Sequence, residues 1–153
     1  MKPKITVLFL LFTVVFGARP AFAQLKRVVD VATVLPSTPP TNFLDFNDEV
    51  AVVSLDRGQM AFIAKDARNI YGIYVSNGTN ITKVVHGDDV EPVTGGSYGG
   101  FSDQRIRDGQ VAFSTGADAN AYCGVYLWNG TSISNIANTN TPVPGGAVGE
   151  TFA

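Results

Sequence analysis

The sequence predicts an all-β protein, and the first observation behind this prediction is an internal repeat. Residues 58–62 read GQMAF and residues 72–79 read GIYVSNGT, while residues 109–113 read GQVAF and residues 124–131 read GVYLWNGT. The copies start 51 and 52 positions apart (109 − 58 and 124 − 72), a period typical of propeller blades and stacked repeats. The second observation is that apolar residues alternate within these stretches, as in half-buried strands.

We therefore expect two tandem antiparallel, blade-like repeats of about 51 residues. Two blades do not close a ring, since four to eight blades are usual, so the expected architecture is an incomplete β-propeller. The alternative is a small two-sheet β-sandwich in which the two repeats pack face to face. In domain terms, we expect a signal peptide at 1–23, an N-terminal strand and Pro-rich connector at 24–48, repeat 1 at 49–99, repeat 2 at 100–150 and the start of a truncated third repeat at 151–153.

The expected strands follow from runs of β-branched and alternating apolar residues between turn signals. They lie near residues 24–34, 49–55, 59–63, 71–76, 80–85, 110–114, 123–128 and 132–137. The first ends at Leu35 because Pro36 cannot continue a ladder of hydrogen bonds. Both faces of the strand around Tyr126 are apolar, which predicts a strand covered on both sides. The pairs Asn77-Gly78 and Asn129-Gly130 predict tight hairpin turns with positive φ at both residues.

The first 23 residues have the features of a secretory signal peptide. Lys2 and Lys4 precede an apolar run over residues 5–16, and Ala21-Phe22-Ala23 supplies a small-x-small cleavage pattern. The apolar core is shorter than the roughly twenty residues that span a bilayer. We expect cleavage, no transmembrane segment afterwards, and a periplasmic, cell-surface or secreted location.

The net charge and the cysteine content limit the kinds of partner and compartment that we expect. The chain has 153 residues and a formal net charge of −2, and its mature part has no cluster of Lys and Arg, so we expect no binding to nucleic acid. The single cysteine, Cys123, can form no internal disulfide and is expected to act as a small core residue. An exported chain with one cysteine is typical of bacteria rather than of small eukaryotic secreted domains.

The repeat phrases permit a comparison with known families. The patterns G-[QR]-x-A-F, G-[IV]-Y-x-x-N-G-T and P-x-P-G-G resemble the tandem repeats of exported bacterial proteins of the choice-of-anchor NxxGxxxAF type. The blades are also similar to TolB-type β-propeller repeats. The resemblance covers roughly residues 49–153, and it departs where Asp56 and Arg107 stand at positions at which that signature has Asn. It implies a repeat class and an export route, but no activity that can be transferred to particular residues.

Residues with catalytic or metal-binding potential are few. His86 is the only histidine, and we expect it in a surface loop. Asp88, Asp89 and Glu91 are candidate Ca²⁺ ligands because carboxylates supply the oxygens that this ion prefers, although their spacing matches no EF-hand loop. A glycoside-acting enzyme would need two carboxylates flanking a sugar. The candidates for such a pair are Asp88/Asp89 and Asp103/Asp118.

We expect an exported non-enzymatic β-repeat module that needs no cofactor and that binds or scaffolds through its loops. Its candidate binding residues are Tyr98 and Phe101, which lie in a Gly-rich stretch where exposure is expected. The expected partners are a protein or glycan ligand, and other copies of the chain through open blade edges. The alternatives are a structural remnant of a longer repeat protein and a glycoside-acting propeller enzyme.

Overall fold

The computed structural model describes residues 28, 30, 32–46, 53–93, 95–115 and 124–152, and these residues form ten strands and no helix. The all-β prediction is thus confirmed. The strands are β1 (Val34–Leu35), β2 (Thr41–Phe46), β3 (Val53–Asp56), β4 (Gln59–Asp66), β5 (Tyr71–Ser76), β6 (Ile81–His86), β7 (Phe101–Arg107), β8 (Gln110–Thr115), β9 (Gly124–Trp128) and β10 (Ile133–Asn138).

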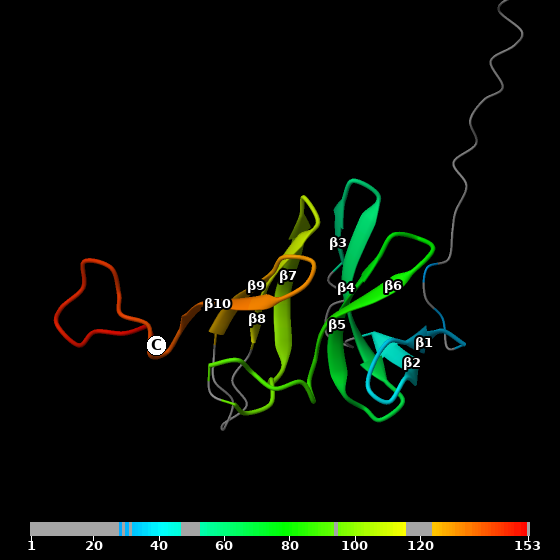
Figure 1. Ribbon diagram of the computed structural model, residues 1–153, viewed down its shortest axis with the longest axis horizontal. Helices are drawn as coiled ribbons and strands as arrows, with labels where there is room; N and C mark the ends of the chain where they lie inside the picture. Colours follow the sequence, from blue (N-terminus) through cyan, green and yellow to red (C-terminus); the bar gives the residue numbers. More distant parts are fainter. Residues whose placement is uncertain are drawn as a thin grey trace, which may run out of the picture.

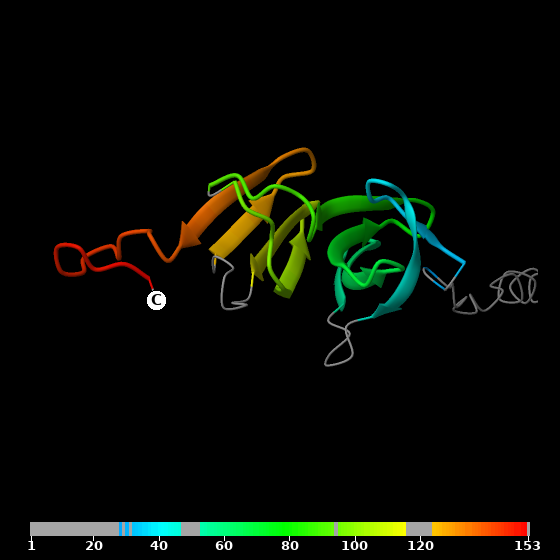
Figure 2. The same cartoon turned by 90° about the horizontal axis from the view of Figure 1, so that it is seen from below.

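The strands form two antiparallel sheets that lie next to each other (Figure 1). The first sheet has the order β1-β2-β4-β5-β6, and β3 also pairs with β4. The second has the order β10-β9-β8-β7. The two sheets use the same register: Phe62 pairs with Tyr74 in the first, and Phe113 with Tyr126 in the second. The first sheet is strongly curled, which is visible when the molecule is viewed from below (Figure 2).

The N-terminal part differs from the expectation. The described residues between 28 and 33 are not in a strand, so the strand expected over 24–34 is wrong there. Asp30 turns the chain, because its Oδ1 accepts a hydrogen bond from the Ala32 N–H (3.0 Å) and its carbonyl accepts one from the Thr33 N–H (2.8 Å). Strand β2 formed where we expected only a connector, because β4 offers it an open edge from Asp66 to Ala64.

Hairpin turns also differ in type from the expectation. The Asn-Gly pairs do connect paired strands, but only their glycines have positive φ. Asn77 instead acts as an acceptor: its Oδ1 binds the N–H groups of Thr79 (2.9 Å) and Asn80 (2.8 Å). Two-residue turns with positive φ at both positions occur two hairpins earlier, at Arg57-Gly58 between β3 and β4 and at Asp108-Gly109 between β7 and β8.

The main hydrophobic core lies between the two sheets, and a smaller core lies on the other face of the first sheet. The main core consists of Ala61, Ile63, Ile73, Val75, Val84, Val85, Tyr98, Phe101, Ile106, Val111, Phe113, Tyr126 and Trp128. The smaller one consists of Leu35, Phe43, Phe62, Ala64 and Tyr74. Strand β5 is therefore covered on both sides. For β9 that expectation is wrong, because Tyr126 is buried whereas Val125 on the opposite face is 45% exposed.

The repeated phrase Gly-x-Tyr has a packing reason. A Cβ atom built on Gly72 would lie 2.8 Å from the Tyr74 hydroxyl oxygen, and one on Gly124 would lie 2.7 Å from that of Tyr126. Each tyrosine ring therefore lies over the glycine two positions before it on the same face of the strand. Any side chain at the glycine would occupy the space of the ring.

Candidate functional site

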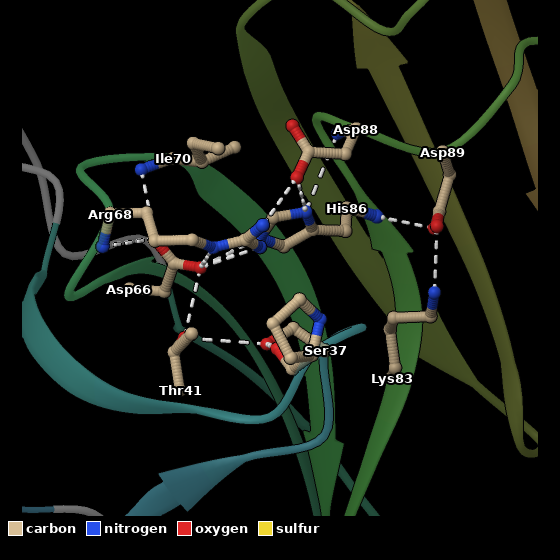
Figure 3. A network of polar contacts seen from close by, with 10 residues as sticks. Ser37, Thr41, Asp66, Arg68, Ile70, Lys83, His86, Asp88 and Asp89 are labelled. Carbon is tan, nitrogen blue, oxygen red and sulfur yellow. Dashed lines mark hydrogen bonds and ion pairs between the residues drawn. The ribbon is translucent and has the colours of Figure 1, made fainter.

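A network of polar contacts is built around Asp66, the last residue of β4 (Figure 3). Its carboxylate is fully buried. Oδ1 accepts hydrogen bonds from the N–H groups of Arg68 (2.9 Å) and Ile70 (3.1 Å). Oδ2 accepts hydrogen bonds from Thr41 Oγ1 (2.9 Å) and Arg68 Nε (3.0 Å). One carboxylate thus joins β2, the end of β4 and the turn that leads to β5.

His86 lies beside this carboxylate, and the expectation of a surface loop is wrong. It is the last residue of β6 and is 2% exposed. Its Nε2 is 3.3 Å from Asp66 Oδ2, and its Nδ1 accepts a hydrogen bond from the Asp88 N–H (3.4 Å). The backbone of His86 pairs with that of Gly72 on β5, so the histidine belongs to the sheet and its ring turns inward over the end of the strand.

The three candidate Ca²⁺ ligands bind three different sets of partners. Asp88 Oδ2 is 2.8 Å from Arg68 Nη1. Asp89 accepts hydrogen bonds from Lys83 Nζ (2.7 Å) and from the His86 N–H (2.8 Å). Glu91 is buried and points elsewhere, toward Tyr126. In the part of the chain that the structure describes, no group of three or more His, Cys, Asp or Glu side chains is placed to hold a metal ion.

The surroundings of Asp66 and Arg68 favour the ionised form of both side chains. Burial raises the pKa of the Asp66 carboxyl, but the hydrogen bonds from Ile70, Thr41 and Arg68 together outweigh burial and hold the pKa below its ordinary value. The hydrogen bond to Asp66 raises the pKa of the Arg68 guanidinium. The pair therefore stays ionised at neutral pH. A carboxylate that accepts four or more donors is well suited to hold strands together and poorly suited to take up a proton.

The expected exposure of Tyr98 and Phe101 is wrong. Both side chains are 6% exposed, and they pack into the main core. The Tyr98 ring centroid is 5.9 Å from that of Phe101 and 5.4 Å from that of Tyr126. The flanking glycines suggested a solvent loop, but aromatic side chains gain more by leaving water, and the first sheet offers an apolar face to cover them. Their role as binding residues stays a prediction.

Tyr126 and its sequence counterpart Tyr74 provide a matched pair inside the two cores. The Tyr126 hydroxyl donates a hydrogen bond to Glu91 Oε1 (3.0 Å), and burial together with this carboxylate raises the pKa of Tyr126 to about 12. The Tyr74 hydroxyl is equally buried and has no hydrogen-bond partner among the described residues. The residues around Tyr74 thus fit its ring but leave its hydroxyl unsatisfied.

We expect Tyr126→Phe to destabilise the protein by about 1–3 kcal/mol, because it removes a donor from a buried carboxylate. Tyr74→Phe is expected to change stability by less than about 0.5 kcal/mol or to stabilise, because it removes an unsatisfied buried hydroxyl. Urea denaturation of both variants gives the comparison, and each serves as the control for the other. Equal losses in the two variants would contradict the assigned hydrogen bond.

The structure does not describe Cys123, which we expected in the core, Asp118, which we considered as a catalytic carboxylate, or the signal peptide expected at 1–23. Among the residues that the structure does describe, no helix is long and apolar enough to cross a membrane.

The Asp66 cluster itself was missed by sequence reasoning. The only available signal was the order Asp66-x-Arg68 two residues before Ile70, and a short-range charge pair of this kind is common on protein surfaces.

Comparison with known proteins supplies no relative: no family model, no curated protein and no solved structure matches the chain. The resemblance to choice-of-anchor and TolB-type repeats therefore stays a prediction.

Proposed function

We propose that the protein is an exported, non-enzymatic β-repeat module that binds a partner or acts as a scaffold at the cell surface or in the periplasm. The observation that carries this proposal is that the polar cluster around Asp66 serves the fold. Asp66, Arg68 and Asp88 are engaged with one another and with backbone groups, so their charges are balanced within the protein and are not directed at a substrate.

Export is supported by the residue pattern at 1–23 and by the use of a single cysteine. The tandem blade-like repeats support a scaffold, because the two sheets share one strand register and pack on each other through a common hydrophobic core. Loops on such a scaffold carry recognition without needing a catalytic constellation.

A groove beside the Pro-rich segment is the surface that we propose for a ligand. It has a volume of about 630 Å³ and lies between that segment and the β5–β6 turn. The described residues that line it include no charged side chain; they are Val28, Thr33, Val34, Leu35, Pro36, Pro40, Ser76, Gly78, Thr79, Asn80 and Ile81. A lining of this kind suits a neutral glycan or an uncharged peptide segment rather than an ion or a phosphate.

A glycan and peptide array, probed with the purified protein, tests the proposal. Reproducible binding that is lost in Thr79→Trp, which fills the groove, would support a binding module. Thr131→Trp places the same side chain in the matching turn of the second sheet and serves as the control. Hydrolysis of any probe would contradict the absence of enzymatic activity, and silence across both arrays would favour the alternative of a structural remnant of a longer repeat protein.

The glycoside-acting alternative has less support from the geometry. Asp88 and Asp89 are held by Arg68 and Lys83 respectively. Their carboxylates are thus paired with cations of the protein, whereas a pair of catalytic carboxylates would flank a bound sugar.

A further inference from the structure

The first sheet has two edges with which no described strand pairs. The strand order places β1 at one end of the sheet and β6 at the other, so each of them has a described neighbour on one side only. Residues of both strands line the groove beside the Pro-rich segment: Val34 and Leu35 form β1, and Ile81 is the first residue of β6. The groove therefore lies between the two end strands of the curled sheet (Figure 1).

The ladder between β5 and β6 fixes which backbone groups of β6 point away from the sheet. The Asn77 N–H donates a hydrogen bond to the Asn80 carbonyl (3.3 Å), and from this pair hydrogen-bonded and non-hydrogen-bonded positions alternate along the hairpin. Ile81 pairs with Ser76 at the next position, so its N–H and C=O point away from β5. Lys83 has the same orientation two residues later.

Strand β1 presents its backbone in the same way. The Phe43 N–H donates a hydrogen bond to the Thr33 carbonyl (2.8 Å), which makes these residues a hydrogen-bonded pair. Val34 pairs with Asn42 at the next position, so its N–H and C=O point away from β2. Its side chain is 58% exposed. The strands on both sides of the groove thus offer the backbone donors and acceptors that a further strand needs.

A side chain caps the far end of the β6 edge but not the end at the groove. The His86 N–H donates to Asp89 Oδ2 (2.8 Å), and Lys83 Nζ is bound to Oδ1 of the same carboxylate (2.7 Å) (Figure 3). Such charged groups commonly protect an edge strand from pairing with another chain. In the described part of the chain, no side chain caps the backbone of Ile81 in this way. The β6 edge is therefore open where it lines the groove.

We propose that the groove binds an extended peptide strand of a partner protein, which pairs through its backbone with the edges of β1 and β6 and so continues the first sheet. This inference rests on the proposed function, because it names the class of partner for the same groove. An extended strand carries N–H and C=O groups along both of its sides, at a rise of about 3.3 Å per residue. The side chains that suit the groove are small or β-branched and uncharged, since its lining includes Val34, Thr79 and Ile81.

Binding of synthetic peptides with and without backbone N–H groups tests the proposal. The probes are peptides of about six residues built from Val, Thr and Ser, and the controls are the same peptides with N-methyl groups on alternate residues. We expect methylation to weaken binding by about 10-fold or more, because it removes backbone donors and keeps the side chains. Amide hydrogen exchange, measured by NMR, is expected to slow at Val34 and Ile81 when an unmodified peptide binds.

A substitution in β1 tests the protein side of the same hydrogen bonds. Val34→Pro removes an N–H that points away from β2, and proline is tolerated at such a position of an edge strand. We expect it to weaken peptide binding by about 10-fold. Val34→Thr keeps the N–H and the branched shape, so it is the matched control and is expected to bind like the wild type. Urea denaturation of both variants checks that the fold is retained.

Three results would overturn the proposal. One is binding of a neutral oligosaccharide that Thr79→Trp abolishes and that leaves exchange at Val34 and Ile81 unchanged; the groove would then keep its proposed function, and only the peptide assignment would fail. Another is peptide binding that backbone methylation does not weaken. The third is an absence of binding by every peptide, and if the glycan array were silent as well, the proposed binding function would fail together with this inference.

Discussion

Asp66→Ala is expected to lower the free energy of unfolding by about 3–5 kcal/mol. The variant removes a fully buried carboxylate that accepts hydrogen bonds from the backbone N–H groups of Arg68 and Ile70 and from the side chains of Thr41 and Arg68. The Arg68 guanidinium would lose its buried partner, and the two backbone donors would lose their acceptor. Urea denaturation followed by tryptophan fluorescence measures the loss.

Asp88→Ala is the control for this experiment. Asp88 pairs with the same Arg68, but its side chain is 46% exposed, so its loss is expected to cost about 1 kcal/mol or less. Similar losses in the two variants would show that the buried hydrogen bonds of Asp66 are not what stabilises the fold.

The same carboxylate makes stability depend on pH in a defined direction. The pKa of Asp66 is lower in the folded protein than its ordinary value, so its contribution is fully present above the ordinary pKa of an aspartate, about 3.9. It is lost as the pH falls through the lower pKa of the folded state. We expect the wild type to lose stability below about pH 4, and Asp66→Ala to show a flatter profile there.

Gly124→Ala is the second substitution with a large expected effect, a destabilisation of about 1–3 kcal/mol. The added methyl group would lie 2.7 Å from the Tyr126 hydroxyl oxygen. The ring cannot move aside freely, because it stacks on Phe113 at a centroid distance of 5.4 Å and its hydroxyl is bound to Glu91. Thermal unfolding monitored by circular dichroism measures the change.

Gly100→Ala is the matched control. A Cβ atom at Gly100 would have nothing within 4 Å, and the residue does not have positive φ. We expect its melting temperature to stay close to that of the wild type or to rise slightly, since alanine restricts the unfolded chain. If Gly100→Ala destabilised as much as Gly124→Ala, the tyrosine contact would not be the cause.

Much of the strand arrangement could be predicted because it depends on local patterns. The alternation around Met60 and Phe62 places both side chains on the same face of β4, and this holds whatever packs against that face. Turn chemistry is similarly local, but it was predicted less well. The Asn-Gly pairs marked the hairpins correctly, whereas positive φ at both turn residues occurs at Arg57-Gly58 and Asp108-Gly109, where no Asn-Gly signal exists.

Burial of individual residues depended on which segments meet in space. Tyr98 follows a loop rich in glycine, and nothing near it in the sequence indicates that the first sheet will cover it. His86 is last in its strand, and its burial depends on Asp66, which lies 20 positions earlier. The missed strand β7 carries mostly polar residues, because only one of its faces packs on the first sheet.

The sequence by itself determined the all-β class, most of the strands and the matching of positions between its two copies, because alternation, turn residues and repetition are properties of neighbouring residues. Only the tertiary structure decided which face of each sheet is covered. Ile73 and Val125 stand at matched positions of similar chemistry, yet one is fully buried and the other is 45% exposed. The reason is physical: burial of an apolar side chain requires a second surface, and the first sheet has the second as its neighbour on the face that carries Ile73, whereas Val125 keeps part of its side chain in water.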